Sequence, residues 1–332
     1  MVALGEAEVP AGRNTLVGRI EGTARTVVDL ARNKLRSENE FTDRMRLMTG
    51  RAAIHAQRSA RHTFKYLWDA EVSVYSQWGE DGILDYLCDG MDLVKPKALE
   101  LGAGNFIECN TRFLAEHRSA SVVAVDGRND LASTIASLGL EWKTTVMALE
   151  QWITPGNVGE ICARAREFMG GIDILSLDID GNVYWVAETV DLTSISIIVV
   201  EYNAIFGATA SVSVPRDDSF DRTEAHFSWL YYGASIRAFV DLFSRRGFDL
   251  VGTNRVGTNA FFVRRGVFTF ENLSLPDPDD LVPYVDLRVR ESRDRNGALN
   301  YLGGNARREV IKDLPFIDVN TREQTTLAVL PL

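Results

Sequence analysis

The stretch Ala98-Leu-Glu-Leu-Gly-Ala-Gly-Asn105 is the part of the sequence from which the fold can be inferred. It is a short apolar run that ends in two closely spaced glycines, a pattern that predicts a buried strand running into a tight turn. Backbone N–H groups in such a turn can approach the polar groups of a ligand. Glu100 is the one acid in the run, and a buried carboxylate is costly unless another group pairs with it. The turn is therefore predicted to form one wall of a binding site.

The composition is that of an ordinary globular protein. The chain has 332 residues, of which 45% are hydrophobic and 25% charged, enough for one large domain with an appendage. A net charge of −10 argues against general binding to nucleic acid or to an anionic membrane, so small molecules are the expected partners. No apolar run approaches the ~20 residues that span a bilayer, and the first residues do not resemble a signal peptide. Three widely spaced cysteines, without a C-x-x-C pair, suit a reducing cytoplasm.

Around the glycine turn, apolar strand-like segments alternate with helical ones. Such alternation predicts parallel strands joined by right-handed crossovers, and hence an open α/β sheet with helices on both faces. Ligands of such sheets bind at the carboxyl ends of the strands. The predicted strands are 98–101, 121–125, 142–147, 172–177 and 195–200, and the predicted helices are 83–88, 110–117, 131–138, 158–168 and 228–246. Two further segments, 248–254 and 259–264, flank a short turn and can only form an antiparallel hairpin.

Three regions are predicted along the chain. Residues 1–71 are rich in helix formers and are predicted to form a helical extension, which serves in oligomerisation of identical chains or as a lid. Its arginines form either a solvated helical face or a basic site for an anionic substrate. Residues 72–266 form the ligand-binding domain. Residues 267–332 form a C-terminal extension that packs on this domain through an apolar group, Val310, Ile311, Leu314, Phe316 and Ile317.

Asp126 decides what the glycine turn binds. It ends the second strand, 22 residues beyond Gly104, where a carboxylate can accept both hydroxyls of a ribose. Dinucleotide-binding and nucleoside-binding sheets share this arrangement. Ile107 stands where a dinucleotide motif has its third glycine, and a terminal antiparallel hairpin differs from an all-parallel dinucleotide fold. Both features favour a nucleoside-type ligand.

At this point the sequence resembles a known family. Leu99-Glu-Leu-Gly-Ala-Gly104, Asp126, Asp178 and the final helix and hairpin are similar to class I S-adenosylmethionine-dependent methyltransferases. The stretches Tyr75-Ser-Gln-Trp-Gly-Glu-Asp-Gly82, Leu177-Asp-Ile-Asp-Gly-Asn-Val-Tyr-Trp185 and Val200-Glu-Tyr-Asn203 resemble the FkbM-like branch, which includes many O-methyltransferases of secondary metabolism and glycans. The resemblance covers residues 72–266. It implies a Rossmann-like sheet of seven strands whose last strand is antiparallel.

The resemblance also implies a cofactor site. S-adenosyl-L-methionine would lie over the turn, with its ribose on Asp126 and its methionine part against Gly102 and Gly104. The residues expected to bind it are Gln77, Glu100, Gly102, Ala103, Gly104, Asp126, Gly127 and Asp178.

Polar residues follow the fourth and fifth predicted strands. Asp178 and Asp180 come after the fourth, and Glu201 and Asn203 after the fifth. Carboxylates so close raise each other's pKa unless a cation neutralises them, and oxygen ligands suit Mg²⁺, Mn²⁺ or Ca²⁺. By similarity to metal-dependent O-methyltransferases, Asp178, Glu201 and Asn203 are predicted to hold such an ion, with Asp180 as a further candidate. The spacing of Glu201 and Asn203 departs from the adjacent Asp-Asn of those enzymes. In two alternatives, Asp178 contacts only the cofactor, or Asp180-Gly181-Asn182 is an Asx-rich turn.

Asp178 and His226 are the candidate catalytic residues. A histidine titrates near neutrality and can act as a general base, although a packing or surface role is the alternative. Tyr231 and Tyr232 either pack on a helix or line the substrate pocket, and residues 206–222 read as a mobile lid.

The leading hypothesis is an S-adenosylmethionine-dependent O-methyltransferase that acts on a hydroxyl of a small metabolite or sugar. One alternative is a catalytically silent methyltransferase-like protein with an assembly or regulatory role, and another is a nicotinamide-dependent oxidoreductase.

Overall fold

The computed structural model describes residues 40–268 and 272–330. The chain divides into two compact units, Met1–Met48 and Thr49–Leu332. In the first unit the described residues, 40–48, are helical, and the helices predicted over residues 14–39 lie outside the described part. The domain boundaries predicted near residues 71 and 266 stay predictions. No helix in the described ranges combines the length and the apolar character needed to cross a membrane.

A seven-stranded sheet organises the second unit, in the order β3-β2-β1-β4-β5-β8-β7. The strands are β1 (Lys97–Leu101), β2 (Ser121–Asp126), β3 (Val146–Glu150), β4 (Ile174–Leu177), β5 (Ile197–Glu201), β7 (Phe248–Thr253) and β8 (Asn259–Arg264). The first five pair in parallel, and β8 runs antiparallel to both of its neighbours, β5 and β7. This order confirms the predicted Rossmann-like sheet of seven strands with an antiparallel last strand.

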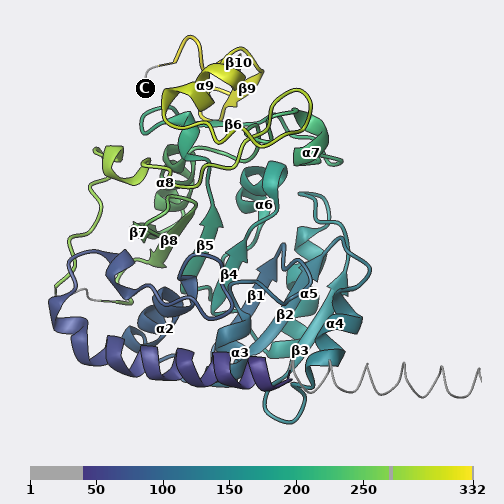
Figure 1. Ribbon diagram of the computed structural model, residues 1–332, viewed down its shortest axis with the longest axis vertical. Coiled ribbons are helices and arrows are strands. Elements are labelled where there is room, and N and C mark those ends of the chain that lie inside the picture. The colour runs from purple at the N-terminus through teal and green to yellow at the C-terminus, as the bar shows by residue number, and fades with distance from the viewer. Residues whose placement is uncertain (1–39, 269–271, 331–332) are drawn as a thin grey trace, which may run out of the picture. The chain divides into compact units, whose positions relative to one another are not determined.

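Both faces of the sheet are covered by helices (Figure 1). Side chains alternate between the faces along each strand, so Leu99 and Leu101 pack on one side while Ala98 packs on the other. The helices that pack on the face of Leu99 are α5 (Val158–Met169), α6 (Val183–Thr189) and α8 (Ile236–Arg245). The Ala98 side carries α2 (Glu80–Gly90), α3 (Arg112–Arg118) and α4 (Leu131–Leu138). Strands buried on both faces explain the continuous apolar runs in the sequence.

Two predicted elements begin later in the structure than the sequence indicated. The strand predicted over 142–147 is β3, which starts at Val146, because residues 141–143 form a turn whose Trp142 is exposed. The helix predicted over 228–246 is α8, which starts at Ile236. Ser235 caps it by accepting a hydrogen bond from the backbone N–H of Ala238, and Gly233 just before it has a positive φ of 67°. The aromatic residues ahead of this cap are therefore irregular backbone, although their apolar character imitates a helix face.

The helical residues 49–60 attach to α2 through ion pairs. Arg58 reaches Asp85 and Asp89, and Arg61 lies 2.9 Å from Asp89. Arg118 from α3 joins the same two acids. Arg44, Arg46, Arg51 and Arg58 are exposed, which agrees with the predicted solvated helical face, and Arg58 and Arg61 in addition form ion pairs with α2.

A second, smaller sheet joins the C-terminal residues to the rest of the unit. Its strands are β6 (Val212–Ser213), β9 (Phe316–Asp318) and β10 (Gln324–Thr325), in the order β10-β9-β6. Ile311 of α9 (Asn305–Ile311) and Phe316 are buried in a separate apolar cluster with Phe206. In Figure 1 this part, drawn in yellow, lies beyond the ends of β4 and β5 toward which the strand arrows point. The short remaining helices are η1 (Arg61–Thr63), η2 (Leu67–Ala70), η3 (Asp180–Asn182), η4 (Ala204–Phe206), α7 (Arg222–Ala225) and η5 (Val282–Tyr284).

Candidate functional site

A cavity of about 210 Å³ lies at the carboxyl ends of β1, β4 and β5, where an open α/β sheet binds its ligands. The chain segments that line it come from the whole length of the second unit. They are Gln77, Trp78, Glu80, Glu100, Gly102, Glu108, Cys109, Asn110, Asp178, Glu201, Ile205, Arg222, Leu230, Tyr232, Thr258, Asn259, Leu287, Val289 and Glu291.

The glycine turn lets two strand ends approach each other closely. A Cβ atom on Gly102 would lie 1.6 Å from the carbonyl oxygen of Asp178, and the φ of Gly102 is +90°. Only glycine fits this position. Gly104 also has a positive φ, +54°, but a Cβ atom there would meet nothing within 4 Å. The turn is therefore closed toward β4 at Gly102 and open at Gly104, which is a shape that leaves room for a ligand.

Asp126 holds the turn from the end of β2. One carboxylate oxygen, Oδ2, accepts the backbone N–H of Gly104 at 2.8 Å, and Oδ1 accepts that of Arg128 at 3.0 Å. Gly127 lies under the ring of Trp152, which a Cβ atom on the glycine would approach to 2.6 Å. Of the predicted cofactor residues, Gln77, Glu100, Gly102 and Asp178 line the cavity, whereas Ala103, Gly104, Asp126 and Gly127 lie beside it.

Glu100 is buried and paired. Its carboxylate accepts the backbone N–H groups of Asn110 at 2.7 Å and Thr111 at 3.2 Å, and also the Thr111 hydroxyl. Burial nevertheless raises the pKa of this carboxyl, because the hydrogen bonds offset only part of the lost hydration. Glu100 thus anchors the loop before α3, and this answers the need for a partner that its burial in an apolar strand implied.

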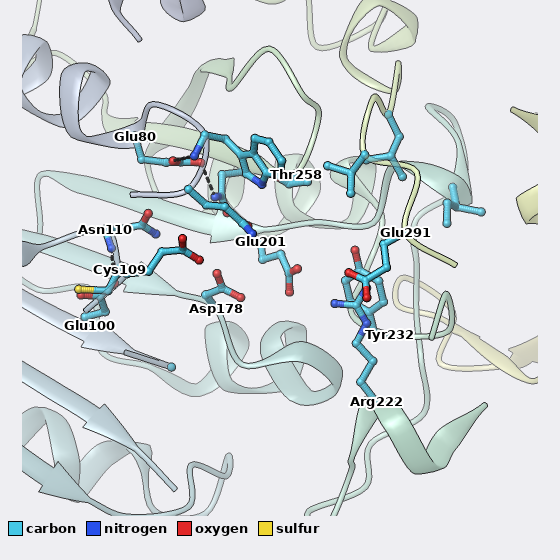
Figure 2. Close-up of a pocket in the computed structure, with 18 of the residues that line it drawn as sticks. Glu80, Glu100, Cys109, Asn110, Asp178, Glu201, Arg222, Tyr232, Thr258 and Glu291 are labelled. Carbon is cyan, nitrogen blue, oxygen red and sulfur yellow. Dashed lines mark hydrogen bonds between the residues drawn. The ribbon is translucent and has the colours of Figure 1, made fainter. Parts of the chain in front are cut away.

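Asp178 and Glu201 form a half-buried acid pair in the middle of the cavity (Figure 2). Two carboxylate charges this close repel each other, which favours a proton on one of the two groups. Burial and the charge of Asp180 raise the pKa of Asp178 to about 7. Burial and Asp178 raise the pKa of Glu201 well above its usual range. The second oxygen of Glu201, Oε2, is buried and accepts no hydrogen bond from the described residues.

Arg222 faces the acid pair from the other side of the cavity, together with Tyr232 and Glu291 (Figure 2). Its guanidinium lies 3.8 Å from the centre of the Tyr232 ring and 3.4 Å from Asp180. Its Nε donates to the carbonyl oxygen of Trp229 at 2.8 Å. Arg222 is therefore fixed by its own contacts in the segment predicted as a lid. Tyr232 lines the cavity, and Tyr231 packs instead against Phe316.

The residues proposed to hold a metal do not come together as a ligand set. The amide of Asn203 is fully buried; it donates to the carbonyl oxygens of Leu230 and Tyr232, each at 3.0 Å, and accepts from the backbone N–H of Ile205. Asp180 pairs with Arg222. Across the described residues, no group of three or more His, Cys, Asp or Glu side chains could hold a metal ion. Asp178 and Glu201 remain as two adjacent oxygen donors, but Asn203 is used to fasten the 230–232 loop.

His226 does not line the cavity. Its Nδ1 is 2.7 Å from the hydroxyl of Ser228, and its ring lies against Phe227. Burial and the nearby Arg295 lower its pKa.

The polar turn after β4, Asp180–Asn182, is a short 3-10 helix. The side chain of Asn182 exchanges hydrogen bonds with the backbone of Asp217 in the 206–222 segment. That segment is thereby tied to the end of β4.

Sequence reasoning missed two parts of the wall. Glu80 accepts hydrogen bonds from the side-chain amides of Asn254 at 2.7 Å and Asn259 at 2.9 Å, and so joins α2 to the β7–β8 hairpin. The motif Tyr75–Gly82 was the signal for it, because the neighbouring Asp81 accepts three backbone N–H groups of residues 74–76 and folds the motif around the cavity. The other part, Leu287, Val289 and Glu291, belongs to the C-terminal extension, where the polar sequence gave no signal.

Ile107 needs a correction. A glycine at this position would serve the close packing of a helix on the sheet, but α3 begins only at Arg112 and Ile107 is 44% exposed in the preceding loop. The size of this side chain therefore does not distinguish a dinucleotide-binding site from a nucleoside-binding site. The antiparallel β8 is the feature that separates this sheet from an all-parallel dinucleotide fold.

Comparisons with known proteins add little to this geometry. No protein-family model matches the chain, and no curated protein matches it. Among solved structures, the chain is similar to a proposed sarcosine dimethylglycine methyltransferase from Galdieria sulphuraria, with 12% identity and a TM-score of 0.31 over 51% of this chain. It is also similar to EvdMO1, with 11% identity and a TM-score of 0.31 over 63% of this chain. The aligned regions span 61% and 46% of those two chains. At these scores the fold assignment rests on the sheet order itself.

Proposed function

We propose that the protein is an S-adenosylmethionine-dependent methyltransferase that acts on a hydroxyl group of a small metabolite or sugar, as the resemblance to the FkbM-like branch suggests. The observation that supports this most is the continuity of the cavity. It reaches from Gly102 at the end of β1, past the acid pair, to Arg222 and Tyr232. A cofactor at one end and an acceptor at the other would meet beside Asp178 and Glu201.

The cofactor end has the features that such a ligand needs. The open side of Gly104 leaves space over the turn, and Asp126 keeps a free lone pair on each carboxylate oxygen for the ribose hydroxyls. Gln77 and Asn110 add polar side chains at the same end. S-adenosylmethionine, when bound, supplies an electrophilic methyl group on a positively charged sulfur. Methyl transfer then depends mainly on the alignment of the acceptor oxygen.

The acid pair is suited to take the acceptor's proton. A hydroxyl must lose its proton as the methyl group is transferred, and a carboxylate with a raised pKa near neutrality is an effective base. The pKa of Asp178 is raised to about 7, and the neighbouring Asp178 charge raises the pKa of Glu201 well above its usual range, so Asp178 is the carboxyl whose pKa lies near neutrality. In this proposal Asp178 receives the proton, and Glu201 Oε2 stays available for a different contact with the acceptor. His226 has no part in the step, because it lies outside the cavity.

A divalent ion is not part of the proposal. The third predicted ligand, Asn203, uses both ends of its amide within the protein, and the remaining donors are two carboxyl groups that share a proton. Chelation with EDTA tests this directly, since turnover that survives EDTA agrees with the proposal and turnover abolished by EDTA and restored by Mg²⁺ contradicts it.

The decisive experiment is calorimetry with S-adenosylhomocysteine. We expect binding by the intact protein and at least about tenfold weaker binding by Asp126→Asn, which keeps the shape of the side chain but removes its charge. Asp218→Asn, an exposed position outside the cavity, is the matched control. If the intact protein does not bind S-adenosylhomocysteine, the proposed function fails.

A further inference from the structure

We infer that the methyl acceptor carries a protonated amine, which binds between Glu201 and Asn259 at the β5–β8 edge of the cavity. This inference names the acceptor class and rests on the function proposed above.

The charge of the cavity favours a cation. Its acidic lining residues are Glu80, Glu100, Glu108, Asp178, Glu201 and Glu291, although burial raises the pKa of Glu100, Asp178 and Glu201, and its basic lining residue, within the described part of the chain, is Arg222. Arg222 is already paired with Asp180 and stacked on Tyr232. An anionic acceptor, such as a phosphorylated sugar, would enter a field of the same sign.

Two buried oxygens provide the specific contact. Asn259 is 6% exposed, and its amide nitrogen is held 2.9 Å from Glu80, which determines that the amide oxygen Oδ1 is the free end. No described residue donates a hydrogen bond to Asn259 Oδ1 or to Glu201 Oε2. A buried acceptor without a donor costs about 1–3 kcal/mol, so two of them in one cavity indicate a ligand that supplies donors.

The sheet places these two oxygens side by side. Glu201 and Asn259 are directly opposite each other in the antiparallel pairing of β5 with β8. Side chains of such pairs project from the same face with Cβ atoms roughly 4.5–5.5 Å apart. An ammonium group has three N–H donors and can bond to both oxygens at once, whereas a hydroxyl has one donor. Trp78 lines the same cavity and offers an aromatic surface, which favours a cation further.

The cofactor also has an ammonium group, but its expected place is different. The glycine turn follows β1, and the sheet order puts β4 between β1 and β5, with β8 one strand further. The Glu201–Asn259 pair is therefore on the acceptor side of the cavity. The experiment must separate the two sources.

The test uses the full chain saturated with S-adenosylhomocysteine at pH 7 and matched pairs of neutral and cationic probes. The pairs are glucosamine with N-acetylglucosamine, tyramine with N-acetyltyramine, and putrescine with N-acetylputrescine, and binding is followed by saturation-transfer NMR and calorimetry. Glucose 6-phosphate serves as the anionic probe. We expect at least one amine to bind about tenfold tighter than its acetylated partner, and glucose 6-phosphate not to bind. Equal binding within every pair, or no binding by any amine, overturns the inference.

Two variants test whether Glu201 and Asn259 cause the preference for amines over their acetylated partners. Glu201→Gln and Asn259→Leu should each weaken amine binding about tenfold and leave the affinity for S-adenosylhomocysteine within about twofold. If they weaken S-adenosylhomocysteine instead, the acidic edge serves the cofactor and the inference is wrong. Absent binding of S-adenosylhomocysteine by the unmodified protein is the separate failure of the proposed function.

Discussion

The two ends of the cavity are built in different ways. The cofactor end is formed by consecutive backbone, Gly102 to Gly104, held by one acid from the neighbouring strand. The acceptor end is assembled from segments far apart in the sequence: the end of β5, the start of β8, Arg222, and residues 287–291 of the C-terminal extension. The first end has a shape that tolerates little change. The second depends on contacts that fasten separate segments, and we call residues 287–302, the longest of these, the strap.

One buried side chain, that of Arg307, contacts the strap at three carbonyl oxygens. Arg307 is 2% exposed and donates to the carbonyl oxygens of Leu302 at 2.7 Å and Leu287 at 3.4 Å, and also to that of Val289. The backbone N–H of Arg288 donates to Val256 in the β7–β8 turn. The acceptor wall can therefore lose its structure while the sheet stays folded, whereas the glycine turn is part of the sheet.

The largest effect should follow a change in the turn. We expect Gly102→Ala to destabilise the protein by roughly 3 kcal/mol or more, because the new Cβ atom would overlap the carbonyl oxygen of Asp178 at 1.6 Å and the φ of +90° is strained for any other residue. Gly104→Ala is the matched control, since its Cβ atom would meet nothing within 4 Å, and it should cost only about 1–2 kcal/mol for its left-handed backbone. Chemical denaturation measures both. Equal losses would show that the approach of β4 is not what requires glycine.

The next effect concerns the strap. Arg307→Met keeps the length of the side chain but leaves three carbonyl oxygens without their donor, so we expect a loss of about 2–4 kcal/mol. Hydrogen exchange should rise in residues 287–302 while β1 and β2 stay protected, and S-adenosylhomocysteine should still bind. Arg288→Met, an exposed neighbour, is the control. Uniform loss of protection across the sheet would mean that the two ends are not separable.

Replacing Asn203 should cause a smaller loss of stability, and the same variant tests whether this residue binds a metal ion. Asn203→Ala removes the donors to Leu230 and Tyr232 and should cost about 1–3 kcal/mol. Thermal unfolding is measured for both proteins in EDTA and in MgCl₂. We expect the difference between the proteins to be the same in both buffers, because the amide fastens a loop. Stabilisation of the unmodified protein by Mg²⁺, lost in the variant, would assign Asn203 to an ion instead.

The smallest effect is a pH dependence at the acid pair. The pKa of Asp178 is raised to about 7, so the folded protein binds more protons than the unfolded chain between about pH 4 and pH 7. Stability from this group is therefore highest at low pH and falls as the pH rises toward 7. Asp178→Asn removes that dependence and should raise stability at pH 8, relative to pH 5, by ~1 kcal/mol, or roughly 2–4 °C in Tm. A variant that loses stability equally at both values would show that Asp178 is charged in the folded protein.

Sequence reasoning predicted the central sheet because its signals are local. The apolar runs of β1, β2, β4 and β5 are buried on both faces, and Gly139 and Gly170 end α4 and α5 in the left-handed conformation that glycine favours. Asp126 could be found by its distance from the turn. The start of α8 could not, because the apolar residues before it continue a helix-like pattern that Ser235 interrupts.

The acceptor end was predicted only in part, for a physical reason. Asp178 and Glu201 follow strands and are expected at the sheet edge, but the roles of Asn203, His226 and Asn259 depend on which distant segments they meet. Asn203 faces the 230–232 backbone and Asn259 faces Glu80, across 27 and 179 residues of sequence respectively. No local pattern distinguishes these two asparagines. The strap is polar and irregular, and its position depends on contacts with distant residues such as Arg307, Val256 and Ser228.

The buried arginines also bear on when the protein becomes functional during its synthesis. Arg307 fastens the strap, and Arg308 beside it donates to the carbonyl oxygens of Phe206, Leu327 and Leu330. The seven strands of the large sheet are complete once residue 264 has left the ribosome. A nascent chain can therefore form its glycine turn while the acceptor wall is still being translated, and the strap gains its contacts with Arg307 only after that residue has emerged.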